Sequence, residues 1–303
     1  MWKALIRPGM IFLAFALGFA CPAAHQLNWL IRWLLVGMLY MVCLQLKFRE
    51  LKLKRSHFKL LAANLLMGIV PYFLLHWAGR EDWALAAFFV GITPTANAAP
   101  VVMGFLHGRV GYVVTAFVLL NLGVSLALLL LLPLVTGQFS WHFVGTVGDS
   151  LLFIIGLPVA LAVITRLFWR KAKEWPAKCR NLSFGAWSCA LFIIAADASF
   201  FFHGNPHLSW TLLLGIAVIS LLICLANFIG GYWLGSKYLR RESSQSLGQK
   251  NTMFTLFLAL TFANPLVAMG PTFYVLWHNI WNALQMFLYD RRRAKRQALL
   301  KVK

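Results

Sequence analysis

Continuous runs of apolar residues, separated by short polar segments, recur along the whole chain. A helix needs about 20 mostly apolar residues to cross the hydrocarbon core of a bilayer. Because the runs are continuous rather than alternating, they exclude a transmembrane β-barrel. The pattern predicts ten spanning helices, approximately over residues 4–21, 27–46, 58–78, 82–106, 110–136, 142–168, 182–202, 209–235, 245–267 and 270–289.

Composition agrees with this reading. The 303 residues are 61% hydrophobic and only 12% charged, and the mean hydropathy is +0.74. A soluble domain would carry about 25% charged residues. We therefore predict an all-α polytopic membrane protein. The first apolar run also fits a cleaved signal peptide, but we expect it to be retained as a spanning helix, because the count of ten then gives a balanced architecture.

The net charge of +20 would suit a nucleic-acid binder, but its distribution indicates membrane topology instead. In a ten-span protein, all but three of the 28 Lys and Arg residues fall on one face, the exceptions being Arg32, Arg80 and Lys250. By the positive-inside rule both termini are cytoplasmic. We expect a multi-pass protein of the cell membrane, most simply a bacterial inner membrane, with the lipid bilayer and no nucleic acid as a partner.

An even number of spans with both ends on one side allows two sets of five. Five is odd, so the two sets have opposite orientations, which is the geometry of an inverted repeat. The predicted repeats cover residues 1–138 and 139–290, and a basic cytoplasmic tail follows over 291–303.

The fourth span of the first repeat contains a breakable polar segment. Pro94 and Pro100 flank Thr95 and Asn97 in the middle of an apolar run. Proline removes a backbone donor and clashes with the preceding turn, so this helix should unwind there. Ordinary kinking of an intact helix is the alternative, because proline is common in membrane helices.

The fourth span of the second repeat contains a similar segment. Gly248 there adjoins Gln249, Lys250, Asn251 and Thr252. Interrupted spans at matching positions of two repeats are the best sequence indication of a transporter's binding site. We therefore predict that the two interrupted helices cross at the membrane midplane around one cavity. Helix N-termini at such a break attract anions.

These segments resemble the bile acid:sodium symporter family. The resemblance covers the chain in outline and is most specific over "PTANAAPVVMGFLHGRVGYVVTAFVLLN" (94–121) and "GQKNTMFTLFLALTFANPLVAMGPTFYVLWHN" (248–279). It implies interrupted, crossing helices four and nine, and transport of a small organic anion. Substrates in the family range from bile-acid-like sterols to pantoate and 2-keto acids. The Trp-His-Asn often found in helix ten stands at 277–279.

Most sodium ligands of the family are missing. Its helix-four Ser-Asn pair falls on Ala99 and Pro100, and its helix-nine Glu and Gln fall on Ser246 and Lys250. The helix-five hydroxyl position falls near Asn121. An ammonium group can occupy the space and supply the charge of a bound sodium ion, so we expect no sodium coupling.

Lys250 is the central residue of this hypothesis. An ionisable residue inside a membrane is a functional candidate by default, whereas snorkelling to the interface is the simpler alternative. Burial disfavours a charged amine, so Lys250 is also a candidate proton carrier. Asp197 is predicted as the one intramembrane carboxylate, because Asp149 lies near the start of its span and is assigned to the interface. Asp197 is either a partner of Lys250 or an interfacial residue. The candidate binding residues are Lys250, Asn97, Thr95, Asn251, Asn121, Gln249, Ser246 and Asp197.

The predicted function is secondary active transport of a small carboxylate by alternating access. A ten-helix exporter of the drug/metabolite type is the alternative, and it would not require interrupted helices. We expect that the protein is not an enzyme, because the sequence contains no recognisable grouping of acid, base and nucleophile residues. We also expect no cofactor or metal, since the five cysteines form no CxxC pattern.

Overall fold

In the computed structural model, helices joined by short turns and loops make up most of the described part of the chain, and one isolated β-bridge is the β-structure found there. Side-chain positions are described for most of these residues. The described residues are 10, 13–45, 51–96, 98–138, 140–204 and 209–301.

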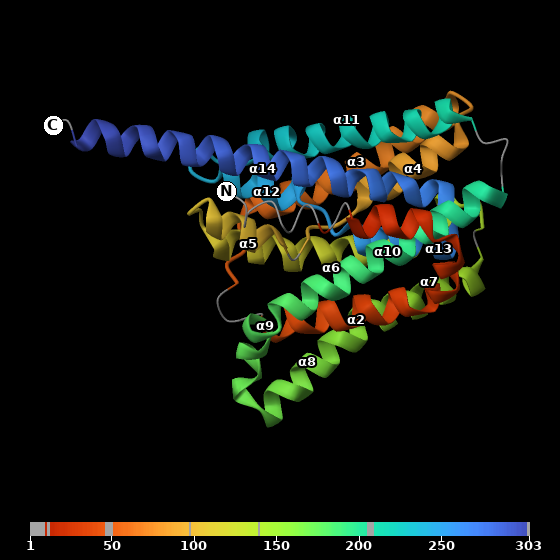
Figure 1. Cartoon of the computed structure of the whole chain (residues 1–303), viewed down its shortest axis with the longest axis horizontal. Helices are drawn as coiled ribbons and strands as arrows, with labels where there is room; N and C mark the ends of the chain where they lie inside the picture. Colours follow the sequence, from red (N-terminus) through yellow and green to blue (C-terminus); the bar gives the residue numbers. More distant parts are fainter. Residues whose placement is uncertain are drawn as a thin grey trace. The chain divides into compact units, whose positions relative to one another are not determined.

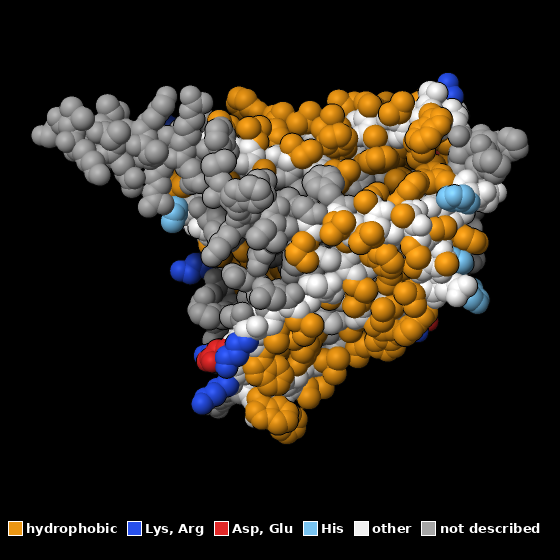
Figure 2. Space-filling view, viewed as in Figure 1, with side chains coloured by type: hydrophobic (Ala, Val, Ile, Leu, Met, Phe, Trp, Pro, Cys, Tyr) orange, Lys and Arg blue, Asp and Glu red, His pale blue; other side chains and the backbone are white. Residues whose placement is uncertain are grey.

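Among the described residues, five helices are long and apolar enough to cross a membrane. Hydrophobic side chains cover much of the visible described surface (Figure 2). Exposing such an apolar surface to water would be unfavourable, whereas the hydrocarbon core of a bilayer accommodates it. The prediction of an all-α chain with several membrane-compatible helices is confirmed at this level. The five helices are Pro22–Leu44, Arg55–Trp77, Val110–Val135, Trp141–Phe168 and Trp210–Leu234.

The chain forms two compact units, each assembled from three segments. The first unit contains Met1–Phe48, Ala127–Leu213 and Phe257–Val267. The second unit contains Arg49–Leu126, Leu214–Leu256 and Ala268–Lys303. These units group residues by compactness and do not bear on the predicted repeat boundary at 138/139, which stays a prediction.

In the first unit α2 (Asn28–Gln45) packs beside α8 (Leu157–Phe168) and α10 (Arg180–Gly204) (Figure 1). Tyr40 of α2 donates a hydrogen bond to Thr165 of α8 over 3.0 Å. The remaining elements are η1 (Pro22–Leu27), α7 (Trp141–Leu151), a π-helical turn η3 (Leu152–Gly156), η4 (Arg170–Glu174) and α9 (Trp175–Lys178).

The second unit contains two series of helices with the same order. A long helix, two short helices joined by an unwound segment and another long helix follow one another, and then the order recurs. Helices α6, α11, α13 and α14 extend past the limits of this unit. The first series is α3 (Arg55–Trp77), α4 (Glu81–Ile92), α5 (Ala98–Phe105) and α6 (Val110–Val135), and the second is α11 (Trp210–Leu234), α12 (Arg240–Gly248), α13 (Thr252–Phe262) and α14 (Pro265–Lys301).

Glycines allow α3 and α4 to lie side by side (Figure 1). A Cβ atom at Gly91 of α4 would overlap the carbonyl of Met67 in α3, and one at Gly68 would lie 2.9 Å from the Ile92 backbone nitrogen. Small residues permit close backbone approach between membrane helices, where packing and polar contacts drive association. This close pairing fixes the end of α4, which the site depends on.

The interruption in the first series is shorter than the prolines suggest. Helix α4 ends at Ile92 and α5 begins at Ala98, so Pro94 lies in the break while Pro100 lies in the first turn of α5. A proline in a first helical turn removes a donor that has no intrahelical partner. Pro71 and Pro133 lie inside α3 and α6, which continue past them.

Two predicted segments fall partly outside the described residues. In the first predicted span, 4–21, residues 4–9, 11 and 12 lie outside the described residues, and residues 13–20 are helical. The predicted tail over 291–303 continues as part of α14 as far as Lys301.

Replacing Gly91 with alanine should destabilise the second unit. The added methyl group meets the backbone of α3, and overpacking of this kind costs about 1–3 kcal/mol. Gly111→Ala is the matched control, because a Cβ at that position of α6 meets nothing within 4 Å and alanine favours the helix. Thermal unfolding of the purified variants should give a lower midpoint for Gly91→Ala only. Equal midpoints for the two variants would contradict the close packing.

Candidate functional site

The two unwound segments pair with each other through their backbones. Thr95 and Lys250 form an antiparallel β-bridge. The Ala96 N–H donates to the Gln249 carbonyl and the Asn251 N–H donates to the Pro94 carbonyl, each over 2.8 Å. Unwound backbone within a membrane must be satisfied by protein or by water in a cavity. Each interrupted helix therefore supplies the partners that the other needs.

Side chains satisfy the carbonyl groups released at the end of α4. Asn64 of α3 donates to the Ile92 carbonyl over 2.8 Å. The Thr93 hydroxyl donates to the Phe89 carbonyl over 2.6 Å and lies 2.8 Å from the Thr255 hydroxyl. The last four carbonyls of a helix have no intrahelical partner. These contacts let α4 end inside the protein.

The end of α12 is satisfied in the same manner. The Thr95 hydroxyl donates to the Ser246 carbonyl over 2.5 Å, and the Tyr274 hydroxyl donates to the Gly248 carbonyl over 2.8 Å. Asn121 of α6 donates to the Thr95 carbonyl over 2.9 Å. Residues from α6 and α14 thus support the two paired unwound segments, which we call the crossing.

The side chain of Lys250 lies at the C-terminal end of α4. Its side chain is 1% exposed, and its Nζ atom lies 2.5 Å from the Asn64 Oδ1 and 3.1 Å from the Gly91 carbonyl oxygen. An ammonium group has three donors, and these two neutral oxygens are its acceptors in the described part of the chain. A helix C-terminus carries partial negative charge and favours a cation. The amine therefore lies where the local field stabilises positive charge.

Asn64 links the amine to the helix end. Its amide nitrogen donates to the Ile92 carbonyl while its amide oxygen accepts from Lys250. Because one side chain makes both contacts, the oxygen must point at the amine whenever the nitrogen caps α4. The Asn64 side chain is fully buried, so solvent does not compete for these hydrogen bonds.

Gly248 allows a ring to pack against the second interruption. A Cβ atom at this position would overlap the Phe228 ring. Phe228 in turn stacks on Trp281, with ring centroids 5.0 Å apart. Phe228 of α11 therefore packs against the backbone at the second interruption, and Trp281 of α14 supports the Phe228 ring.

Four carboxamide side chains form a connected group beside Lys250. Gln245 of α12 donates to Asn282 over 3.1 Å and to Gln285 over 2.6 Å, and both acceptors belong to α14. Asn282 donates to Gln249 over 2.5 Å. The group brings uncharged hydrogen-bonding atoms to the residue that precedes Lys250.

Several buried polar atoms near this group have no protein partner among the described residues. They come from α11, α12 and α14, which are the helices around the second interruption. Buried polar atoms are normally hydrogen-bonded, so such atoms indicate water or a ligand. In the second unit this set includes Asn227 Oδ1, Gln245 Oε1, His278 Nδ1 and Trp281 Nε1.

Five predicted site residues come together with Lys250. Thr95 and Ser246 bond directly, Asn121 supports Thr95, and Asn251 contributes its backbone N–H. Gln249 contributes its carbonyl to Ala96 and its side chain to the carboxamide group. The structure therefore places Thr95, Asn121, Ser246, Gln249 and Asn251 around the crossing.

The other two predicted residues stand differently. Asn97 lies outside the described residues. Asp197 belongs to the first unit, where its carboxylate is 8% exposed and accepts a hydrogen bond from Asn28 over 2.5 Å. A pairing between Asp197 and Lys250 stays a hypothesis.

Sequence reasoning missed Asn64, Gly91, Tyr274 and the carboxamides of α14. Asn64 had a usable signal, since a single amide within the apolar run of a spanning helix indicates an interhelical hydrogen bond. The role of Gly91 had no such signal, because it acts through its carbonyl. Within the described residues no three His, Cys, Asp or Glu side chains are grouped as metal ligands.

Comparison with known proteins adds no identity to this geometry. No family model matches the chain, and no curated protein matches it.

Proposed function

We propose that the protein is a secondary active transporter of a small organic anion, built from ten spanning helices and working by alternating access. The observation that supports this most is the paired crossing of two interrupted helices with a buried lysine amine at one helix end. Transporters form substrate and ion sites from such discontinuous helices near the bilayer midplane.

The order of helices supports an inverted repeat. Along the chain, the order of a long helix, an interrupted helix and another long helix occurs twice, first over 55–135 and again over 210–301. On this proposal the two series belong to the repeats 1–138 and 139–290, with opposite orientations. The clustered basic loops then place both termini in the cytoplasm.

Lys250 takes the place of a coupling cation on this proposal. Half-helix C-terminal ends and unwound carbonyls coordinate cations in transporters of this design. The Gly91 carbonyl and the Asn64 amide oxygen are such ligands, and both are directed at the Lys250 amine. A sodium ion could not share these oxygens with the ammonium group, so transport should not depend on sodium.

The same geometry favours an anionic substrate. Helices α5 and α13 begin at the two breaks, and helix N-termini attract negative charge. The partners of Lys250 are neutral, so its charge is not cancelled by them. A carboxylate entering the site would compensate that charge and could accept hydrogen bonds from the carboxamide group.

Continuous helices would have favoured the alternative of a drug/metabolite-type exporter, which does not require interruptions, and both helices are interrupted. Transport therefore remains the function that the geometry supports best.

Uptake should proceed without a sodium gradient. Purified protein in proteoliposomes should take up a radiolabelled carboxylate from a panel of cholate, pantoate and pyruvate equally well with external sodium chloride or choline chloride. The reason is that Lys250 already occupies the cation ligands. Protein-free liposomes are the control. Uptake that disappears in choline chloride would refute the assignment of the site.

Replacing Lys250 with glutamine should abolish the response of uptake to a proton gradient. The variant has no amine to carry a proton, and a neutral side chain also loses its attraction for the substrate. Lys52→Gln is the matched control, because Lys52 is exposed. Uptake should be measured with an imposed pH gradient in both directions. An unchanged pH response in Lys250→Gln would exclude the proton role.

Replacing Asn64 with leucine should destabilise the folded protein by about 1–3 kcal/mol or more, because the buried Lys250 amine then keeps only the Gly91 carbonyl as an acceptor among the described residues and the Ile92 carbonyl loses the Asn64 donor. The double variant Asn64→Leu/Lys250→Met should recover part of the lost stability, since it removes the amine that has lost an acceptor. Thermal unfolding in one detergent gives the comparison. Additive losses in the double variant would show that the two residues do not interact.

A further inference from the structure

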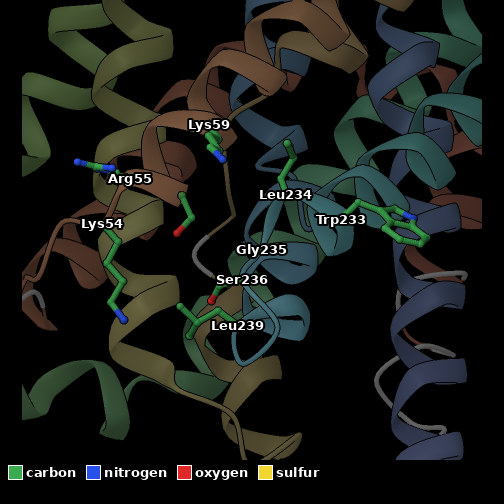
Figure 3. A pocket seen from close by; sticks show the side chains of 9 residues that line it. Lys54, Arg55, Lys59, Trp233, Leu234, Gly235, Ser236 and Leu239 are labelled. Atoms are coloured by element: carbon green, nitrogen blue, oxygen red, sulfur yellow. The ribbon is translucent and has the colours of Figure 1, made fainter.

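A basic pocket lies in the second unit, between the start of α3 and the end of α11 (Figure 3). Its volume is about 450 Å³, which is in the range of small-molecule sites. It shares no lining residue with the helix crossing. The lining residues are Lys54, Arg55, Ser56, Lys59, Trp233, Leu234, Gly235, Ser236 and Leu239.

The lining is positively charged and contains no acidic residue. Lys54, Arg55 and Lys59 supply three cationic groups, and all three side chains are exposed. Lys59 and Ser236, both labelled in Figure 3, contribute an amine and a hydroxyl to the lining. The Ser56 oxygen accepts a hydrogen bond from Tyr112 over 2.8 Å, which leaves its own O–H free to donate. These groups suit an oxyanion with several acceptors.

The position of the pocket indicates a lipid. It lies where one membrane-compatible helix begins and another ends. Farther along these helices, large apolar side chains are exposed, including Leu66 in α3 and Leu222 in α11. A headgroup bound in the pocket could therefore leave its acyl chains against an apolar helix surface. A free ion would gain nothing from that surface.

An aromatic side chain reinforces the pocket wall. Trp233 is 71% exposed, and tryptophan is enriched at membrane–water interfaces. The Arg240 guanidinium lies 5.9 Å from the Trp233 ring centroid and 5.2 Å from that of Tyr232. Arg240 thus adds positive charge beside the pocket, and its buried Nε–H group has no acceptor among the described residues.

We propose that this pocket binds a phosphate group, namely the headgroup phosphate of an anionic phospholipid. Basic pockets between membrane helices bind anionic headgroups in this manner. Lys59 and its two basic neighbours neutralise the phosphate, the serine hydroxyls donate to its oxygens, and Trp233 and Leu234 contact the start of the acyl chains. A lipid bound there joins α3 to α11, which belong to different series of helices.

Native mass spectrometry of the purified protein provides the test. The probes are phosphatidylglycerol, phosphatidylcholine with the same acyl chains, and inorganic phosphate. We expect the protein to retain one phosphatidylglycerol in preference to phosphatidylcholine. The triple variant Lys54→Gln/Arg55→Gln/Lys59→Gln should bind that lipid at least about tenfold more weakly, because each basic residue contributes to the attraction.

The triple variant Lys171→Gln/Lys173→Gln/Lys178→Gln is the matched control. It removes the same charge from exposed positions of the first unit and should bind the lipid as the parent does. The single variant Lys59→Gln tests the pocket with a smaller change if the triple variant does not fold. Retention of inorganic phosphate without a lipid preference would support the phosphate site and assign it to a free ion. Equal losses in the two triple variants, or no loss in either, would overturn the proposal.

Discussion

The backbone pairing of the two unwound segments is the constraint on which the second unit depends. A break in a membrane helix exposes N–H and C=O groups that the bilayer cannot satisfy, at several kcal/mol for each group. Pro94 and Asn251 share one of the resulting hydrogen bonds, and Ala96 and Gln249 share the other. Either break alone would leave these backbone groups without hydrogen bonds, so the two must occur at the same place in the fold. Asn64, Thr95, Asn121 and Tyr274 then satisfy the remaining carbonyls.

A tethered cation differs physically from a bound one. A sodium ion must be stripped of water and can leave, whereas Lys250 is attached to the chain at the crossing itself. Its ammonium group meets the same type of ligand, namely a helix-end carbonyl and an amide oxygen. The amine stays at the end of α4, and its positive charge can leave only as a proton. On the proposed function, coupling through this site is therefore restricted to protons.

Local chemistry made part of this structure predictable. Pro94 and the polar run around Lys250 predicted the two interruptions. Proline disfavours a continuous helix, and polar residues are unfavourable inside a membrane span unless they have a specific role. Proline by itself was a poor guide, since Pro71 and Pro133 lie within continuous helices and Pro100 is accommodated in a first turn. A lone amide in an apolar run indicated an interhelical hydrogen bond for Asn64, but its pairing with Lys250 was not predictable, because 186 residues separate the two. Gly91 acts through its backbone carbonyl and gave no signal. Such contacts depend on tertiary packing, which periodicity does not specify.

The neutrality of the Lys250 partners links anion binding to protonation on the proposed function. If the amine is protonated, the crossing has a positive charge that its oxygen ligands do not cancel. A carboxylate that binds nearby then stabilises the protonated form, and the proton strengthens carboxylate binding by the same free energy, because coupling between two ligands is reciprocal. The loaded site would be electrically neutral. A site of this kind favours joint movement of one proton and one monovalent anion, since moving either charge alone across the low-dielectric core is more costly.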